Sequence, residues 1–387
     1  MLGKSIGAAG LALALSAGIA AAQETVKIGL IQSMTGAFNT VGKAAVNGAR
    51  LYIQQHGDRV AGKKIELIVK DDATQPDVAK RLAQELIVND KVAILGSGIT
   101  PVSLTIAPLS TEAKIATVVM VSGASITVER SPYFVRTSFT LGQSSEVIAD
   151  WAVKNGAKKI VTIVNDWAPG IESETVFKDR VAKAGGEIVG SLRVPLANPD
   201  FAPFLQRARD LGPDTLFCYF PGNQAGVFAK QFLERGMDKS GIRLIGPLDL
   251  TDDDELPGMT DAVLGIITAG HYSALHDSAL NKTYVKDFMA AYGKRPNFVS
   301  LGGYDGMHLI YEALKKTNGN TNGDALIAAM KGMKWESPRG PMSIDPETRD
   351  LIHDEYIRKV EKVNGELYNV EFINVGPVKD PLHGVKK

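Results

Sequence analysis

The chain reads TVKIGLIQS at residues 25–33 and GKAAVNGARLYIQQHG at residues 42–57. The first run is rich in apolar and β-branched residues and ends in polar ones, whereas the second has apolar residues at helical spacing. A strand, a helix and a strand follow, as KKIELIVKDDA (63–73), PDVAKRLAQELIVND (76–90) and VAILGSG (92–98) indicate. Strands that alternate with helices in this way predict a parallel sheet wound on both faces.

The same alternation begins again further along the chain. Helical spacing in 143–156 is followed by the strand pattern KKIVTIVND (158–166), and more helix and strand patterns lead to DTLFCYF (214–220). Long helical patterns then return, and a β-rich tail covers 354–375. Because 387 residues exceed one typical domain, we expect an α/β fold with two Rossmann-like lobes, each built on a parallel sheet.

Residues 1–22 have the pattern of a secretory signal peptide. Lys4 precedes the apolar run IGAAGLALALSAGIA, and Ala20 and Ala22 satisfy the small-x-small rule for cleavage before Gln23. This run is too short to span a bilayer, and the sequence has no other apolar run of membrane length. We therefore expect an exported, soluble mature chain without stable membrane insertion, with a retained N-terminal anchor as the alternative.

The charge balance and the single cysteine narrow the classes of function. The 43 basic and 43 acidic residues cancel, so the sequence lacks the positive charge typical of nucleic-acid binders and of polybasic membrane-surface proteins. Cys218 has no second cysteine with which to form an internal disulfide, and its apolar neighbours predict a buried strand residue rather than a nucleophile. Small molecules and proteins are the partners that we expect.

The glycine-containing turn LGSGITPVS (95–103) has three interpretations: a phosphate loop, a carboxylate-binding turn, or a tight turn alone. It lacks the glycine, lysine and hydroxyl spacing of a nucleotide-binding loop, which disfavours the first. Thr100 before Pro101 predicts a helix N-cap, and the same hydroxyl is able to face a ligand. The sequence also lacks catalytic and metal-binding motifs, so we expect no enzyme activity, no cofactor and no metal site.

Several stretches in a fixed order resemble one protein family. They are VKIGLIQSMTGAFNTVGKAAVNGARL (26–51), IELIVKDDATQPDVAKRLAQELI (65–87), VAILGSGITPVSLTIAPLSTEAKI (92–115), SGAS (122–125), NDWAPGIES (165–173), GVFAKQFLERG (226–236), LIGPLDLTD (244–252), FVSLGGYDGMHLIYEAL (298–314) and SPRGPMSIDPETRD (337–350). Together they make the mature chain similar to the type I periplasmic solute-binding proteins of the branched-chain amino acid (Leu/Ile/Val-binding) family, which serve ABC importers.

The resemblance implies a Venus-flytrap of two lobes, each discontinuous in sequence. Three crossings are expected near residues 138, 270 and 344. The N-terminal lobe then holds 23–138 and 271–343, and the C-terminal lobe holds 139–270 and 344–387. The resemblance further implies a monomer in the periplasm, with permease subunits of an ABC importer as partners. A small-molecule ligand is expected in the cleft between the lobes, which closes over it by hinge bending.

The resemblance also implies a set of ligand-binding residues. On the N-terminal lobe, the ligand carboxylate is expected to be held by the hydroxyl and backbone N–H groups of Thr100, Gly123, Ala124 and Ser125. The remaining candidates lie after strands of the C-terminal lobe, in the first loop, or at a crossing, and they are Phe38, Trp167, Phe220, Leu248, Asp249 and Tyr272. For Phe38, Trp167 and Phe220, packing within their own lobe is the alternative, and for Tyr272 the alternative is a position that faces the hinge.

One departure from the family pattern bears on the ligand class. Amino acid binders of the family place a carboxylate directly after the Gly-Pro pair of the strand matching LIGPLD, where it pairs with the ligand ammonium. This chain has Leu248 there, and Asp249 follows one place on. An ammonium without a partner in a dry cleft is unfavourable, so we expect an aromatic or other hydrophobic carboxylic acid as ligand. A branched-chain or other hydrophobic amino acid is the alternative ligand. A ligand sensor of the same fold and an exported enzyme are alternative functions of the protein.

Overall fold

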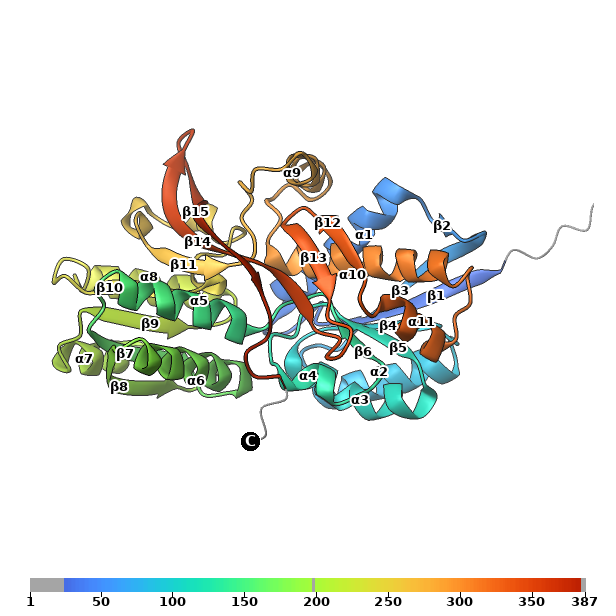
Figure 1. Ribbon diagram of the computed structural model, residues 1–387, viewed down its shortest axis with the longest axis horizontal. Helices are drawn as coiled ribbons and strands as arrows, with labels where there is room; N and C mark the ends of the chain where they lie inside the picture. The colour runs from blue at the N-terminus through green and yellow to red at the C-terminus, as the bar shows by residue number, and fades with distance from the viewer. Residues whose placement is uncertain (1–23, 197–198, 384–387) are drawn as a thin grey trace, which may run out of the picture.

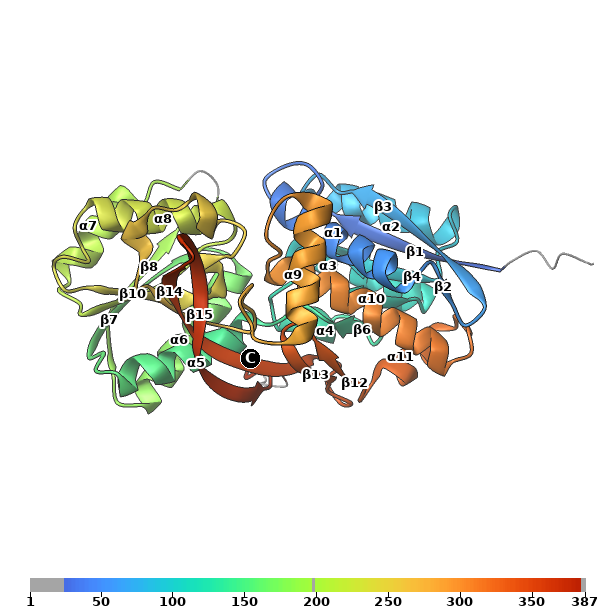
Figure 2. The same ribbon diagram turned by 90° about the horizontal axis from the view of Figure 1, so that it is seen from above.

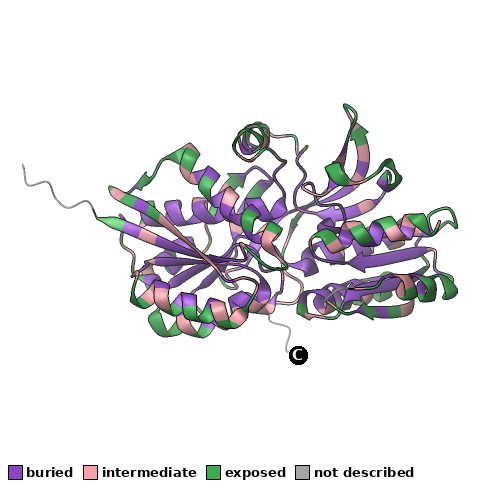
Figure 3. Cartoon of the chain, turned by 180° about the vertical axis from the view of Figure 1, so that it is seen from behind, coloured by how far each residue is buried: buried purple, intermediate pink, exposed green. Residues whose placement is uncertain are grey.

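The computed structural model describes residues 24–196 and 199–383 and shows two α/β lobes side by side (Figures 1 and 2). The N-terminal lobe is built on a six-stranded sheet and the C-terminal lobe on a nine-stranded sheet. Buried residues fill the strands and the inner faces of the helices in both lobes, while exposed residues lie on the outer helix faces and loops (Figure 3). The predicted signal peptide, residues 1–22, lies outside the described residues. No helix within the described ranges is long and apolar enough to cross a membrane.

The sheet of the N-terminal lobe has the strand order β2-β3-β1-β4-β5-β6, and its pairings are parallel except that between β2 and β3. Its elements are β1 (Thr25–Gln32), α1 (Asn39–His56), β2 (Arg59–Val60), β3 (Lys63–Asp71), α2 (Pro76–Val88), β4 (Ile94–Ser97), α3 (Thr100–Ala113), β5 (Ala116–Val119), α4 (Ile126–Glu129) and β6 (Phe134–Arg136). Strands β4 and β5 are buried along their whole length, as expected for parallel strands covered on both faces.

Three later helices return to the N-terminal lobe, namely α9 (Ala279–Tyr292), α10 (Phe298–Lys316) and α11 (Gly323–Met330). Helices α1 and α10 pack backbone to backbone because glycines stand where they meet. A Cβ atom on Gly48 would lie 1.8 Å from the carbonyl oxygen of Ser300, and one on Gly303 would lie 2.0 Å from that of Ala45. This close packing fixes the N-terminus of α10 at the boundary between the lobes.

The C-terminal lobe has parallel pairing among β7 to β11. Its elements are α5 (Leu141–Lys154), β7 (Lys159–Asn165), α6 (Ala168–Lys183), β8 (Glu187–Val194), α7 (Ala202–Asp210), β9 (Thr215–Tyr219), α8 (Asn223–Glu234), β10 (Arg243–Pro247), the short 3₁₀ helices η1 (Leu248–Thr251), η2 (Leu256–Gly258) and η3 (Asp261–Val263), and β11 (Ile267–Gly270). Cys218 is fully buried in β9, which confirms its prediction as a buried strand residue.

The last four strands extend this sheet toward the N-terminal lobe. They are β12 (Lys334–Ser337), β13 (Gly340–Ile344), β14 (Leu351–Val363) and β15 (Glu366–Val378). The start of β14 pairs with β13 and its middle pairs with β11, so one 13-residue strand serves both lobes. Figure 1 shows β12 and β13 beside α10, and Trp335 of β12 donates a hydrogen bond to Asp305 of that helix (3.3 Å). The strands after α11 thus belong to the second sheet although they pack on the N-terminal lobe.

Two buried ion pairs hold the segment between β6 and α5, where the chain first passes from one sheet to the other. The Arg136 guanidinium contacts the carboxylate of Asp350 at 2.5 Å, and Arg339 contacts Asp305 at 2.7 Å. Arg339 also donates to the backbone oxygens of Thr137 (2.6 Å) and Ser138 (3.1 Å). Since both guanidiniums are fully buried and paired, these pairs fix the path of the crossing.

Candidate functional site

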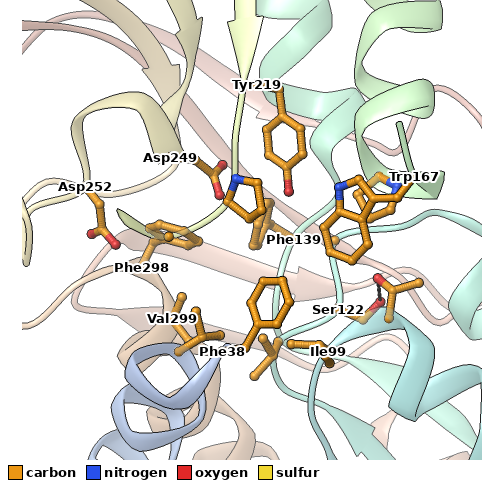
Figure 4. A pocket seen from close by; sticks show the side chains of 17 residues that line it. Phe38, Ile99, Ser122, Phe139, Trp167, Tyr219, Asp249, Asp252, Phe298 and Val299 are labelled. Atoms are coloured by element: carbon orange, nitrogen blue, oxygen red, sulfur yellow. Dashed lines mark hydrogen bonds between the residues drawn. The ribbon is translucent and has the colours of Figure 1, made fainter. Parts of the chain in front are cut away.

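A pocket lies between the lobes, and most of its walls follow the carboxyl ends of strands, while Phe298 and Val299 come from the start of α10 (Figure 4). This is where open α/β sheets bind ligands. The cavity between the walls has a volume of about 60 Å³ and is partly open to solvent, and this volume is below the usual range for small-molecule sites. The lining residues are Phe38, Val41, Ile99, Thr100, Val121, Ser122, Gly123, Phe139, Trp167, Pro169, Tyr219, Pro221, Gly222, Asp249, Asp252, Phe298 and Val299.

One corner of the pocket presents hydroxyl groups. The hydroxyls of Thr100 and Ser122 are 2.7 Å apart, and that of Ser122 is 2.8 Å from the hydroxyl of Thr127. Thr100 was predicted as the N-cap of α3, but Ile99 takes that position and Thr100 is the first helical residue. Its side chain therefore bonds to the neighbouring loop rather than to the helix backbone. The N-terminus of α3 still places a positive dipole end and backbone N–H groups at this corner, which favours an anion.

A buried cation supports the loop that forms this corner. The Arg136 guanidinium donates to the backbone oxygens of Ser122 and Ala124, the latter at 2.7 Å, and Ser138 donates its hydroxyl to Ser122 at 2.7 Å. These bonds fix the backbone of residues 122–124 from behind. Among the described residues, none that lines the pocket is Lys, Arg or His, so a ligand carboxylate would be held by hydroxyls, backbone N–H groups and the helix terminus.

Aromatic rings from both lobes form the apolar walls. Phe38, directly before α1, stacks on Trp167, directly before α6, with ring centroids 5.8 Å apart and planes inclined by 24°. A ring inserted between two others needs roughly 7 Å, so a ligand would lie beside this pair rather than between its rings. Phe139 and Phe298 meet edge to face at 5.2 Å on another wall. Figure 4 shows the open space bounded by Phe38, Tyr219 and Trp167.

Two carboxyl groups line the pocket away from the hydroxyl corner (Figure 4). Burial raises the pKa of Asp249 to about 7, against the lowering effect of its own backbone N–H and of Arg358. Burial also raises the pKa of Asp252 well above its usual range, with a further contribution from Asp254 and Asp253. Near neutral pH Asp249 is thus about half protonated, so this end of the pocket offers hydrogen-bond donors as well as acceptors.

The structure brings half of the predicted site residues together in the pocket. The five that line it are Phe38, Thr100, Gly123, Trp167 and Asp249. Ala124 and Ser125 do not line it, because the loop turns toward the other lobe after Gly123. The backbone N–H of Ser125 donates to Glu172 of α6 (2.9 Å), and its hydroxyl donates to Asp380 (2.9 Å).

The other three predicted residues lie behind the pocket wall. Phe220 is buried against Phe201 and Phe228, with ring centroids 4.8 Å and 4.6 Å away. Leu248 is fully buried, and its Cβ atom lies close over Gly270. Tyr272 is also fully buried, and its carbonyl oxygen accepts a hydrogen bond from Arg358. These side chains belong to the core of the C-terminal lobe and its crossing, as the alternative reading of the aromatic candidates holds.

Sequence reasoning missed several lining residues that stand next to predicted ones. Successive residues along an extended segment point to opposite sides, so Tyr219 lines the pocket where Phe220 enters the core. Asp249 lines it where Leu248 does not. Because side chains alternate between the two faces of a strand, the prediction of Cys218 as a buried residue would have placed Tyr219 on the opposite face. Phe139 and Phe298 come from a crossing and a helix start far away in sequence, and no local signal marks them.

One buried group has ligand types that suit a metal ion. His271, His353 and Glu355 each place a ligating atom within 4.8 Å of the others. Burial lowers the pKa of His271 well below its usual value, and the neighbouring cations Arg339 and Arg358 lower it further. The same guanidiniums would repel a bound cation, so we assign no metal role to this group.

Residues 25–365 match the family described as periplasmic binding protein. The chain belongs to this family. It is 61% identical to a solute-binding protein of an ABC transporter from Rhodopseudomonas palustris BisB5, solved in complex with 3,4-dihydroxybenzoic acid. That structure superposes with a TM-score of 0.90, and the match covers 92% of this chain and 99% of that one.

Two further relatives support the same family assignment. A solute-binding protein of an ABC transporter from Rhodopseudomonas palustris HaA2, in complex with p-hydroxybenzoic acid, is 38% identical with a TM-score of 0.90 over 94% of this chain and 100% of that one. A Leu/Ile/Val-binding protein homolog from Brucella suis biovar 1 is 38% identical over 98% of each chain. The family and the two-lobed fold predicted from the sequence are thus confirmed, and this periplasmic binding protein is a solute-binding receptor rather than an enzyme.

Proposed function

We propose that the protein is the extracytoplasmic receptor of an ABC importer and captures a hydroxylated aromatic monocarboxylate. The observation that carries this proposal is the distribution of polar groups in the pocket. An anion-binding corner at Thr100, Ser122 and Gly123 is separated by aromatic walls from the carboxyl groups of Asp249 and Asp252. The ligand carboxylate would lie at the corner, its ring against Phe38, Trp167 and Tyr219, and its ring hydroxyls at the acidic end.

The acidic end suits hydroxyl groups for an electrostatic reason. The protonated form of Asp249 adds little repulsion against an anionic ligand, and it both donates to and accepts from a phenolic hydroxyl. Two carboxyl groups at one end provide partners for two adjacent hydroxyls. The solved relatives that bind 3,4-dihydroxybenzoic acid and p-hydroxybenzoic acid support this assignment.

A branched-chain or other hydrophobic amino acid is the second candidate ligand. The position of Asp249 favours it, because an ionised carboxylate in the pocket would pair with a ligand ammonium even though Leu248 does not reach the site. The Leu/Ile/Val-binding homolog also supports it. The two candidates differ in the charge that Asp249 needs, and this difference is measurable.

Calorimetric titration of the mature chain with four ligands tests the proposal. We expect 4-hydroxybenzoate and 3,4-dihydroxybenzoate to bind more tightly than benzoate, and benzoate more tightly than leucine. Removing both ring hydroxyls should weaken binding by roughly tenfold, since hydrogen bonds of this kind are worth about 1 to 2 kcal/mol. Leucine binding more tightly than all three aromatic acids would overturn the assignment.

The remaining expectations from the sequence are part of the proposal. Residues 1–22 direct export to the periplasm, the crossings near 138, 270 and 344 act as the hinge, and the lobes have the boundaries given above. Permease subunits receive the ligand-bound form, and the receptor is a monomer. Closure by hinge bending follows from the site itself, because residues of both lobes line one pocket.

A further inference from the structure

The loop between α9 and α10 reaches across the boundary between the lobes. It belongs to the N-terminal lobe, since both helices pack against α1 and Tyr292 donates its hydroxyl to the backbone oxygen of Asn47 (3.0 Å). Its side chains nevertheless find their partners on the C-terminal lobe. Figures 1 and 2 show α9 at the boundary on the side of β15.

Three residues of this loop make the contacts. Lys294 pairs with Asp254 at 2.6 Å, and Asn297 donates its side-chain N–H to Asp252 at 3.0 Å. Arg295 is 5% exposed and donates to the backbone oxygen of Leu367 at 2.6 Å.

Arg295 makes two further contacts with the C-terminal lobe. Its guanidinium also pairs with Glu366 and lies 3.5 Å over the ring centroid of Tyr368. Bonds from a planar guanidinium to several fixed partners require one relative position of the two surfaces. Separation of the lobes would break all of these contacts together.

The loop between α9 and α10 also contacts residues of the ligand pocket. Asp252, which accepts from Asn297, lines the pocket, and so does Phe298, the residue that follows Asn297. Asn297 in addition caps α10 by accepting from the backbone N–H of Ser300 at 3.0 Å. A ligand that orders Asp252 and Phe298 therefore acts on the groups that hold the lobes together.

We infer that residues 294–297 form an interlobe clasp that stabilises the closed state and slows the release of the ligand, an inference that rests on the proposed function for its ligand. The clasp adds affinity only through the closed state, because an open cleft makes none of its contacts. Loss of the Arg295 contacts should shift the equilibrium toward the open state by about tenfold, the value of a pair of charge-assisted hydrogen bonds after desolvation.

The variant Arg295→Met tests the clasp, since it keeps an apolar side chain over Tyr368 and removes the charge. Arg180→Met is the matched control, because Arg180 pairs with Asp150 at 2.7 Å within the C-terminal lobe. Stopped-flow tryptophan fluorescence, to which Trp167 of the pocket contributes, gives the rates with 4-hydroxybenzoate as the probe. We expect dissociation about tenfold faster in Arg295→Met, an unchanged association rate, and wild-type rates in the control. Glu366→Gln should give a smaller increase in the same direction.

Two further measurements separate the clasp from other causes. An unchanged dissociation rate in Arg295→Met overturns the inference, and so does a faster rate accompanied by a larger loss of ligand-free thermal stability than in Arg180→Met. If 4-hydroxybenzoate does not bind the wild-type protein, the proposed ligand is wrong. The clasp is then judged from X-ray scattering of the ligand-free proteins, where Arg295→Met should have the larger radius of gyration, and equal radii overturn it.

Discussion

The charge of Asp249 gives the two candidate ligands opposite pH dependences. Burial raises its pKa to about 7, whereas the pKa values of Asp252 and Tyr219 are raised well above their ordinary values. Asp249 is thus a lining group that titrates around neutral pH. An aromatic carboxylate stays ionised across this range, so it prefers the pocket with Asp249 protonated, whereas an ammonium prefers Asp249 ionised.

The magnitude follows from the fraction of protonated Asp249. With a pKa of about 7, this fraction falls from roughly 0.9 at pH 6 to roughly 0.1 at pH 8. If only the protonated form binds an aromatic carboxylate, its affinity falls about tenfold over this interval, and binding at pH 7 takes up about half a proton. Asp249→Asn has no ionisation here, so its affinity should vary little with pH.

Calorimetry with 4-hydroxybenzoate at pH 6, 7 and 8, in buffers with different heats of ionisation, measures both the affinity and the proton uptake. The Asn variant is the control, because its amide keeps the size of the side chain and one acceptor oxygen. An affinity that increases from pH 6 to pH 8 would refute the reasoning. So would a tenfold decrease that persists in Asp249→Asn, since the titrating group would then lie elsewhere.

Three other changes probe the corner, the aromatic wall and the packing of α1. Thr100→Val should weaken binding of 4-hydroxybenzoate by roughly tenfold in calorimetry through the loss of one hydroxyl, while Thr111→Val, on the same helix outside the pocket lining, leaves affinity unchanged. Trp167→Leu removes the stack with Phe38 and should weaken binding of the same ligand by about fivefold or more. An affinity equal to that of the wild type would show that this aromatic pair does not contact the ligand. Gly48→Ala forces α1 and α10 apart and should lower unfolding free energy by about 1 to 3 kcal/mol in denaturant titration, so an unchanged midpoint would contradict the packing described.

The fold was largely predictable because the apolar residues follow clear strand and helix spacings along the sequence. Strands such as Ile94–Ser97 are buried throughout, and helices such as Pro76–Val88 begin with proline and an acidic first turn. The pairing of β12 and β13 with the second sheet was not predictable from local pattern. It depends on the length of β14, whose 13 residues pair with β11 and still extend to β13.

The site was predictable only to the level of loops. Parallel strands bring their carboxyl ends together, so the loops after β1, β4, β5, β7, β9 and β10 could be placed around one cleft. Which residue of each loop faces the ligand changes from one position to the next, as Tyr219 against Phe220 and Asp249 against Leu248 show. Arg136, which fixes the loop at the hydroxyl corner, lies on a strand whose sequence gives no sign of that role.

The buried position of Cys218 makes the protein a convenient scaffold for an optical reporter. Burial raises the pKa of its thiol well above the ordinary value, and its side chain is shielded from solvent, so thiol-reactive dyes should not modify it in the native protein. A cysteine introduced at an exposed position on the rim of the cleft, such as Thr35, would then be the sole reactive thiol of the chain. An environment-sensitive dye attached there would report ligand capture without removal of the native cysteine.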